Sequence, residues 1–542
     1  MHRDAEHAEP VKMETDKAVD TRKALYEVLA HPTVGSKKFL ITIGDRTVGG
    51  MTVRDQMVGP WQVPVADAAV TAVSFEEFKG EAMAMGEKTP IAVSNAAAAS
   101  RMAIGEALTN LVSVDVNLDR IILSANWMGA CGVKGQDAAL YDGVSAASSF
   151  CQELGVSIPV GKDSLSMKTS WKDQAGEDKT VVSPVSLVVS AAAPVYDIRN
   201  NLLPMFAESV RDSSLLLIDL GHGKDRLGGS VYSQVTQRFD SVTPDMEDPK
   251  ELKKFLELIR SLSAKGAILA YHDRSDGGLA AALCEMMFAS HVGVEIVADA
   301  LVSKDRTLNQ ALFNEELGAV IQVARGRAAE VERDFEAAGM GWSLKYLGNL
   351  TQDDHLNIYL EGKCVLSEDR VDLQKAWNEV SWQIARMRDN PECADSEYEL
   401  ISDKHNGGLV LTMGFDPEEN LAAPFINTGV RPKVAILREQ GVNSQNEMAS
   451  AFLQAGFDAV DVHMTDLLEG RAKLADFVGL AACGGFSYGD VLGRRRMGED
   501  HSAQRQTAEL VPPLLRNADN VYVGRLQRLP DDFSAQGSYP RS

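Results

Sequence analysis

Glu106 and Asn110 lie four positions apart in the stretch RMAIGEALTNLVS and could bind a metal ion together. Ile104, Leu108 and Leu111 recur at helical spacing, so the two polar side chains share the opposite face of a predicted helix. A carboxylate and an amide carbonyl one turn apart suit a hard cation such as Mg2+. The alternative is a solvated helix face, which is the commoner role of such a pair.

Further carboxylates stand where predicted strands end. Asp67 follows a short apolar run that Pro60 and Pro64 hold extended in GPWQVPVADAAV. In ILAYHDRSDGGLAAALCEMMFA we expect a buried strand, a polar turn that carries Asp273, and an apolar helix. Asp276 could cap that helix, whose first amides would form an anion site. A plain cap is the simpler role for Asp276, and the role of Asp273 stays open.

Two loops offer contacts for a phosphate group. The glycine-bearing loop from Gly44 to Gly50 follows a strand predicted at Lys38 to Ile43, and its backbone could approach a phosphate closely. The loop from Gly161 to Ser164 ends another predicted strand and supplies a lysine and a hydroxyl. Alternatively, each loop is an ordinary turn without a ligand.

Composition restricts the class of protein. The formal charge of -23 argues against nucleic-acid and anionic-membrane partners. The six cysteines lie far apart without a CxxC pair, so neither a zinc site nor a disulfide framework is indicated, and a cytoplasmic location is expected. No apolar run reaches membrane-spanning length, and the polar N-terminal segment lacks the core of a signal peptide.

Strands and helices alternate along the chain, which predicts an α/β fold in several domains. A third unit opens near residue 431 with a β-α-β pattern typical of a parallel sheet, but it has too few strands to be complete. The predicted domain boundaries are a connector over residues 1–36, α/β domains over 37–204 and 205–367, and a helix with a linker over 368–430.

Six motifs carry a resemblance to a known family: GDRTVGGMTVRDQMVGPWQVPVAD, GEALTN, PVGKDSLSMKT, AYHDRSDGG, RPKVAILREQGVN and ACGGFSYGDVLG. From His2 to about Gly493 the chain resembles the large bacterial type of phosphoribosylformylglycinamidine synthase, also called formylglycinamide ribonucleotide amidotransferase. The resemblance implies an α+β half of the aminoimidazole ribonucleotide synthetase superfamily. A truncated class I glutamine amidotransferase α/β domain would follow over residues 431–493.

The resemblance also implies an activity, an ATP-dependent carbon-nitrogen ligase of purine biosynthesis. ATP would activate the amide of formylglycinamide ribonucleotide, and ammonia from glutamine would displace the phosphate. The family's Mg2+ ligands fall on Asp67, Glu106, Asn110 and Asp273. Its contacts to ATP or ADP fall on Ala66, Asp67 and Ser275.

One departure from the family concerns the start of the chain. In the family, a linker domain and a first synthetase-like half with a catalytic histidine come before the part matched here. The half present resembles the one that holds a structural nucleotide. We therefore expect a fragment that is inactive alone. The alternative is a non-catalytic Mg-nucleotide-binding or interaction module on the same fold.

A second departure begins after Gly493, where the family continues as AGEGWAK but this chain reads RRRMGED. Codons for Gly493 to His501 can be chosen so that reading from the second base gives AGEGWAKT. The same shift over Val523 to Asp532 gives LGVCNGCQM, the nucleophile elbow of the family. We therefore predict a frameshifted, disordered tail over residues 494–542 and no catalytic nucleophile for glutamine. Cys483 ends a predicted strand, and a buried cysteine of that kind is usually inert.

Overall fold

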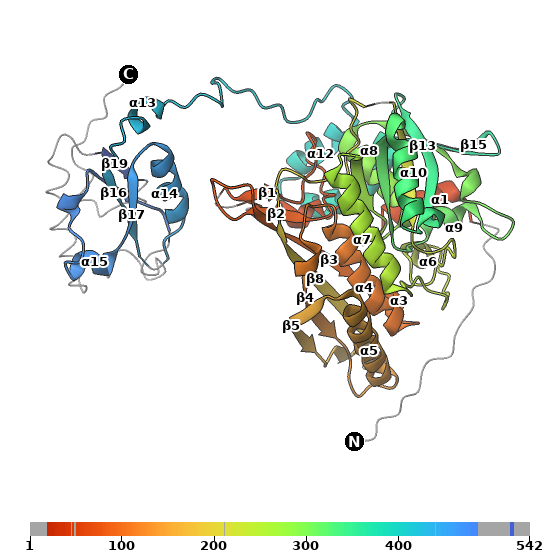
Figure 1. The fold of residues 1–542 in the computed structure, drawn as a ribbon. Helices are drawn as coiled ribbons and strands as arrows, with labels where there is room; N and C mark the ends of the chain where they lie inside the picture. The colour runs from red at the N-terminus through yellow and green to blue at the C-terminus, as the bar shows by residue number, and fades with distance from the viewer. Residues whose placement is uncertain are drawn as a thin grey trace. The chain divides into compact units, whose positions relative to one another are not determined.

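A computed structural model describes residues 19–44, 46–47, 50–210, 212–439, 441–485 and 521–524. The chain divides into two compact units (Figure 1), unit 1 from Met1 to Val410 and unit 2 from Leu411 to Ser542. Among the described residues, no helix is both long and apolar enough to cross a bilayer. Each unit combines strands with helices, so the predicted α/β class is confirmed.

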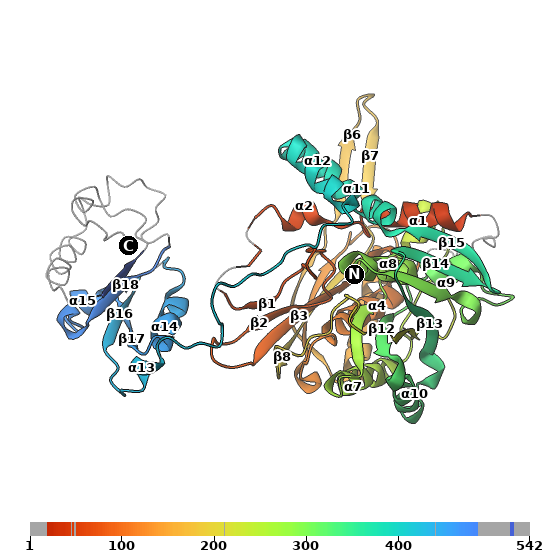
Figure 2. The ribbon, with the colours of Figure 1, turned by 90° about the horizontal axis from the view of Figure 1, so that it is seen from above.

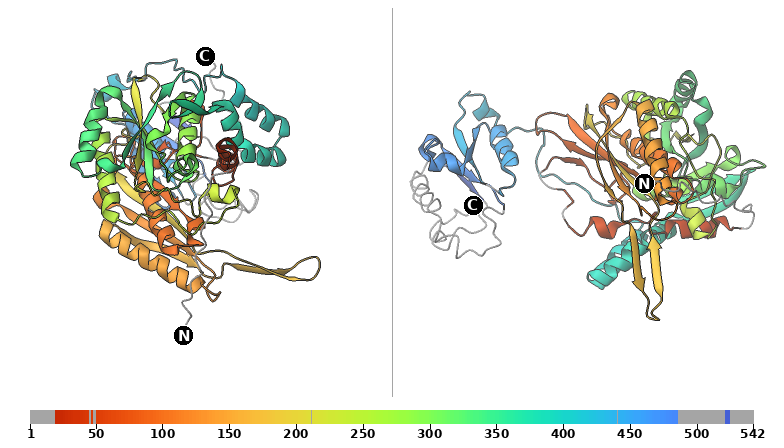
Figure 3. Two further views of the ribbon diagram at one scale, coloured as in Figure 1. Left: turned by 90° about the vertical axis from the view of Figure 1, so that its right-hand side faces the viewer. Right: turned by 90° about the horizontal axis from the view of Figure 1, so that it is seen from below.

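The first sheet of unit 1 has six strands in the order β1-β2-β3-β8-β4-β5. Its strands are β1 (Thr52–Arg54), β2 (Ala69–Ala72), β3 (Gly80–Glu87), β4 (Ile122–Met128), β5 (Ser157–Ser164) and β8 (Ser186–Val195). Neighbours are antiparallel except β4 and β5, which are parallel. The associated helices are α3 (Thr89–Ala92), α4 (Ala96–Leu111) and α5 (Gln136–Leu154). A separate hairpin of β6 (Lys168–Lys172) and β7 (Asp178–Val182) projects from unit 1 (Figure 3).

Helix α4 is buried on nearly every side. It packs on β3 and β8, and the hydroxyl of Tyr271 from the second sheet donates a hydrogen bond of 2.6 Å to the Thr109 carbonyl. Gly86 permits the close approach of β3, because a Cβ there would lie 2.1 Å from the Ala103 carbonyl oxygen. Glu106 is only 8% exposed, so its interpretation as part of a solvated face is wrong.

The second sheet of unit 1 has seven strands in the order β10-β12-β9-β13-β11-β14-β15. They are β9 (Ser213–Asp219), β10 (Ile268–Asp273), β11 (Gly293–Val297), β12 (Gly318–Ala324), β13 (Leu344–Thr351), β14 (His355–Leu360) and β15 (Lys363–Asp369). All residues of β9 are buried. Because side chains alternate along a strand, Leu216 and Ile218 face one core, and Leu215 and Leu217 face the other.

Helices cover both faces of this second sheet. On the Leu216 side lie α7 (Pro249–Ala264) and α10 (Ala328–Ala337). On the Leu215 side lie α1 (Thr21–Leu29), α6 (Val231–Val235), α8 (Gly278–Ser290), α9 (Leu308–Phe313) and α11 (Arg370–Arg388). Helix α1 belongs to the predicted connector, yet Leu25 and Val28 are buried in this core. Strands β9 and β12 are therefore covered on both faces, as their continuous apolar residues require.

Three local predictions are wrong. The segment Lys38 to Ile43 contains the short helix α2 (Lys38–Ile41), which packs on α11. Gly161 to Ser164 is not a turn, because these residues continue β5 in register with β4. The range 368–430, predicted to hold one helix and a linker, contains a second helix α12 (Pro391–Glu399), which packs on α11, so less of it is a linker than expected. In each case tertiary packing decides the local structure.

Unit 2 contains a parallel sheet in the order β17-β16-β18-β19. Its elements are α13 (Ala423–Ile426), β16 (Lys433–Arg438), α14 (Gln445–Gln454), β17 (Asp458–His463), α15 (Met464–Leu468), β18 (Gly479–Ala482) and β19 (Val521–Gly524). Strand β19 belongs to the stretch predicted to be a frameshifted tail. The rest of that tail lies outside the described residues, so the prediction of a disordered segment stays a prediction.

Candidate functional site

Three separate segments bring oxygen ligands together in unit 1. Asp67 lies in the loop before β2, Glu106 lies in α4, and Asp273 ends the buried strand β10. The turn after β10 leads directly into α8, and Gly277 adopts a left-handed φ of 82° at the start of that helix. Strand, turn and helix follow the predicted succession, which places Asp273 at the edge of the sheet.

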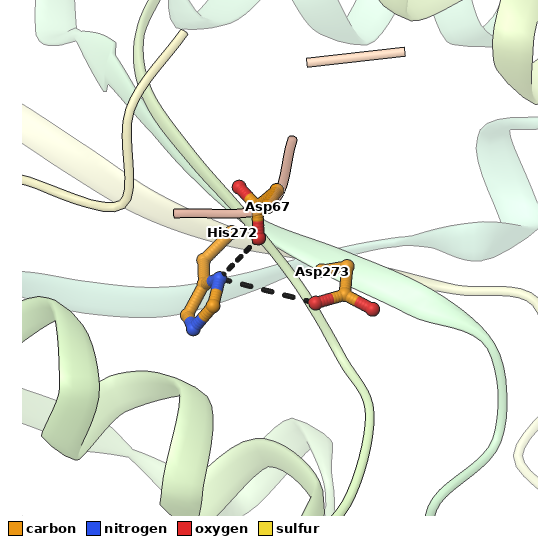
Figure 4. Close-up of side chains that lie close together, drawn as sticks. All are labelled: Asp67, His272 and Asp273. Atoms are coloured by element: carbon orange, nitrogen blue, oxygen red, sulfur yellow. Dashed lines mark hydrogen bonds and ion pairs between the residues drawn. The ribbon is translucent and has the colours of Figure 1, made fainter. Parts of the chain in front are cut away.

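Asp67, His272 and Asp273 form a compact group (Figure 4), which we call the aspartate-histidine group. Asp67 Oδ1 lies 2.6 Å from His272 Nδ1, and Asp273 Oδ1 lies 3.9 Å from the same nitrogen. One ligand atom from each of the three residues lies within 4.8 Å of the others. This spacing allows the two carboxylates to share one metal ion.

Each aspartate of the group keeps a buried oxygen without a hydrogen bond. The Oδ2 atoms of Asp67 and Asp273 have no partner within the described part of the chain. Their side chains are only 1% and 5% exposed. An unpaired buried carboxylate oxygen carries a free-energy cost, which a cation would offset. Carboxylate oxygens are ligands that Mg2+ prefers, so the residues present fit that ion.

Burial and charge set the ionisation of the group. Burial raises the pKa of Asp67, and burial together with the charge of Asp67 raises the pKa of Asp273 well above its usual range. Burial alone would lower the pKa of His272, but Asp67 and Glu285 outweigh it and raise that pKa well above its usual value. The resulting imidazolium supplies positive charge and fixes the orientation of the Asp67 carboxylate.

Glu106 contacts the turn that follows Asp273. Its Oε1 accepts a hydrogen bond from the Ser275 hydroxyl, and its Oε2 accepts one of 2.7 Å from the Glu87 backbone amide. The negative charge of Glu106 also raises the pKa of Asp273, after the larger effects of burial and Asp67. Of the predicted residues, the structure thus brings together Asp67 and Asp273 and places Glu106 and Ser275 beside them.

Other predicted contacts lie apart from this group. Asn110 donates a hydrogen bond of 3.2 Å to the Met85 carbonyl, and none joins it to the aspartate-histidine group in the part of the chain described. The backbone amide of Ala66 donates to Gln56 instead. Lys162 lies on the exposed edge strand β5, where it contacts Ser164. The assignment of these residues to metal, nucleotide or phosphate stays a prediction.

Lys88, which follows β3 and is 2% exposed, was not among the predicted site residues. Its Nζ lies 2.5 Å from Asp276 Oδ1, 3.7 Å from Glu106 Oε1 and 3.9 Å from Glu315 Oε2. Burial would lower the pKa of Lys88, but the carboxylates of Asp276 and Glu106 raise it well above its usual value. Asp276 is therefore an ion-pair partner of Lys88. For Glu315, the effect of burial outweighs the attraction of Lys88 and raises the pKa of this carboxyl to about 7.

The predicted site residues also did not include His272, Glu285 and Glu315. A signal existed for His272, because it directly precedes Asp273 in AYHDRSDGG and both end a buried strand. No comparable signal marks Lys88 or Glu315. Their sequence contexts, GEKTP and FNEELG, are also those of exposed charged residues.

Family models match three successive parts of the chain. Residues 36–194 match the FGAR-AT PurM_N-like domain, and residues 213–361 match the AIR synthase related protein, C-terminal domain. Residues 431–524 match the CobB/CobQ-like glutamine amidotransferase domain. The chain belongs to the phosphoribosylformylglycinamidine synthase type of protein.

In this synthase-type chain, the aspartate-histidine group draws on two of the matched domains. Asp67 comes from the first matched range, as does the neighbouring Glu106, and His272 and Asp273 come from the second. The third match continues beyond Gly493 and includes β19. The predicted domain boundaries, including the one at residue 493, stay predictions.

Solved structures of the synthase type are similar to this chain. The PurL protein of Thermotoga maritima complexed with FGAR is 11% identical, with a TM-score of 0.46, over 66% of this chain and 54% of that chain. PurLQS from Thermotoga maritima is also 11% identical, with a TM-score of 0.48, over 65% of this chain and 51% of that chain. This chain therefore spans about half the length of those chains.

Unit 2 of this synthase-type chain contains Cys483, directly after β18. Burial, and to a smaller extent the charge of Glu447, raises the pKa of its thiol. The thiolate is the nucleophilic form of cysteine, so a raised pKa makes Cys483 a weak nucleophile at neutral pH.

Proposed function

We propose that unit 1 binds ATP or ADP with Mg2+ at the aspartate-histidine group and serves the ATP-dependent amidation of formylglycinamide ribonucleotide. The observation that carries the proposal is the pair of buried Oδ2 atoms of Asp67 and Asp273 that lack hydrogen bonds among the described residues. The three matched domains support the reaction class, a ligase of purine biosynthesis with glutamine as amido donor.

The residues in and around the group would have different roles in binding the metal ion. Asp67 and Asp273 would hold the ion directly, with Glu106 beside them. His272 would keep the Asp67 carboxylate oriented, because its Nδ1 lies 2.6 Å from Asp67 Oδ1. When bound, Mg2+ would neutralise the negative charge of the nucleotide phosphates. Lys88 would hold Ser275 and Asp276 in place at the turn.

A second candidate is a structural role for the nucleotide, without turnover at this group. The deep burial of its ligands favours this role. The side chains of Asp67, Asp273 and Lys88 are all 5% exposed or less. A ligand held by such groups would exchange slowly with solvent. Retention of labelled ADP through gel filtration would indicate the structural role, and rapid hydrolysis of added ATP would indicate the catalytic one.

The test of nucleotide binding is titration calorimetry of Mg-ADP against the wild type and Asp273→Asn. We expect at least about a tenfold loss of affinity, because the variant removes one of the two carboxylates facing the ion. Chelation of Mg2+ should weaken wild-type binding similarly. Asp119→Asn is the matched control, since Asp119 is exposed and lies outside the group. Equal affinity of Asp273→Asn and the wild type for Mg-ADP would refute the metal assignment.

A further inference from the structure

A second cleft in unit 1 shares no lining residue with the aspartate-histidine group. It has a volume of about 200 Å³. Its walls come from α2, the loop after β1, the end of α8, α11 and α12. Helices α2 and α12 both pack on α11 (Figure 2). An apolar cavity of roughly 150 Å³ can hold a benzene molecule, so this cleft has room for one small ring system.

Flat aromatic surfaces line the cleft. Trp61 stacks on His291 with ring centroids 3.6 Å apart, and Trp382 stacks on Tyr398 with centroids 4.3 Å apart. The indole of Trp377 adds a third wall and is fixed by a hydrogen bond of 2.9 Å to the Val34 carbonyl. Such rings favour a planar ligand, which can stack on an exposed face or pack against an edge.

The charged side chains of the cleft already have partners. Lys38 pairs with Glu397, and Arg388 Nη2 lies 2.7 Å from Asp389 Oδ2. A ligand with a net charge would find no unpaired counter-charge among these four residues. The lining therefore favours an uncharged ligand over a phosphate or a carboxylate.

Several polar side-chain atoms that line the cleft make no hydrogen bond with the described residues. Gln374 is 6% exposed, and its Oε1 accepts a hydrogen bond of 2.5 Å from Arg370, whereas its Nε2 makes none with the residues described. Burial, with a smaller effect of Arg370, lowers the pKa of His291 to about 3, so this imidazole is neutral. In the described part of the chain its ring nitrogens make no hydrogen bond. The Asn378 side-chain oxygen likewise accepts none there.

We propose that this cleft binds an uncharged, planar nitrogen heterocycle of the nucleobase or nucleoside class. Its ring would stack among Trp61, Trp377 and Trp382. The polar edge of the heterocycle would accept a hydrogen bond from Gln374 Nε2. It would also form one hydrogen bond with a ring nitrogen of the neutral His291. Neither group has a hydrogen-bond partner among the described residues. A purely apolar ring would leave these groups unsatisfied, so the heterocycle binds more tightly than its hydrocarbon counterpart.

The test uses adenine and adenosine as probes with the full chain in EDTA, so that binding does not depend on Mg2+. Equilibrium dialysis should show saturable binding of at least one probe, whereas naphthalene-like rings without nitrogen bind more weakly. Gln374→Glu keeps an oxygen for Arg370 but removes the Nε2 donor, and should weaken binding about tenfold. Asn378→Leu should also weaken it.

Trp342→Phe is the matched control, because Trp342 stacks on His222 and does not line the cleft. It should bind the probes as the wild type does, and circular dichroism should show that every variant is folded. Three results would overturn the proposal: no saturable binding of either probe, equal binding by Gln374→Glu and the wild type, or, in a parallel dialysis with Mg2+ in place of EDTA, displacement of the probe by Mg-ADP. The last would assign the probe to the proposed nucleotide site.

Discussion

His272 Nε2 lies 2.7 Å from Glu285 Oε2, while the Nδ1 on the other side of the ring faces Asp67. The histidine thus joins a carboxylate of α8 to one in the loop before β2. This relationship makes Glu285, which is not a predicted ligand, an indirect support of the aspartate-histidine group.

We predict that Glu285→Gln lowers the pKa of His272, because the substitution removes one of the two carboxylates that stabilise the imidazolium. NMR titration of the labelled imidazole measures this pKa. Glu251→Gln is the matched control, since it removes the carboxylate 2.7 Å from His222 and should leave the titration of His272 unchanged. An unaltered His272 pKa in Glu285→Gln would contradict the role assigned to Glu285.

Lys88→Met should strongly destabilise unit 1. It leaves Asp276, Glu106 and Glu315 without their shared buried cation, and breaking a buried ion pair costs about 3–5 kcal/mol. Urea unfolding measures the loss. Lys79→Met provides the comparison, because Lys79 pairs with Glu77 at the surface and its removal should matter far less. Similar unfolding midpoints for the two variants would show that the Lys88 cluster adds little to stability.

His291 should contribute a loss of stability to unit 1 as the pH drops from about 7 towards 4. The pKa of this residue is about 3 in the folded chain, below the usual value of about 6.5 in an unfolded one. Between these values the unfolded state binds a proton that the folded state does not, so acid favours unfolding. His291→Asn should reduce this dependence, since asparagine tolerates the left-handed φ of 51° found there. Urea unfolding at several pH values compares the two slopes, and identical slopes would exclude the contribution.

Cys483 should react with iodoacetamide more slowly than Cys364 and Cys393. Burial raises the pKa of the Cys483 thiol, whereas the other two residues are exposed. Peptide mass spectrometry after timed alkylation gives the rates. For the same reason we expect no release of glutamate from glutamine by this chain. Selective labelling of Cys483 by a glutamine-analogue reagent would overturn that expectation.

The local part of the candidate site could be predicted from the sequence. The strand, turn and helix in ILAYHDRSDGG follow from hydrophobic pattern and glycine position, although Asp273, which we predicted on the turn, is the last residue of the strand. The helical face of Glu106 follows from the spacing of Ile104 and Leu108. These features depend on neighbours within a few positions of the chain.

The remaining features depend on contacts between distant segments. Lys88 and Glu315 are far apart in sequence, and only the tertiary fold brings Lys88 Nζ within 3.9 Å of Glu315 Oε2. The apolar run at Lys38 predicted a strand, but packing on α11 favours a helix there. Asn110 shares the predicted helix face with Glu106, yet its amide is held by Met85 of β3. Periodicity identifies a face of a helix but not what lies against it.

The burial of α4 between the two sheets has a consequence for slow motions. Its amide hydrogens can reach solvent only when the sheets separate, so their deuterium exchange should report the opening of unit 1 as a whole. The projecting hairpin of β6 and β7 has exposed residues along both strands, and its amides should exchange through local fraying. The segment that carries Glu106 would then be among the last to lose its protection, long after the hairpin has equilibrated with the solvent.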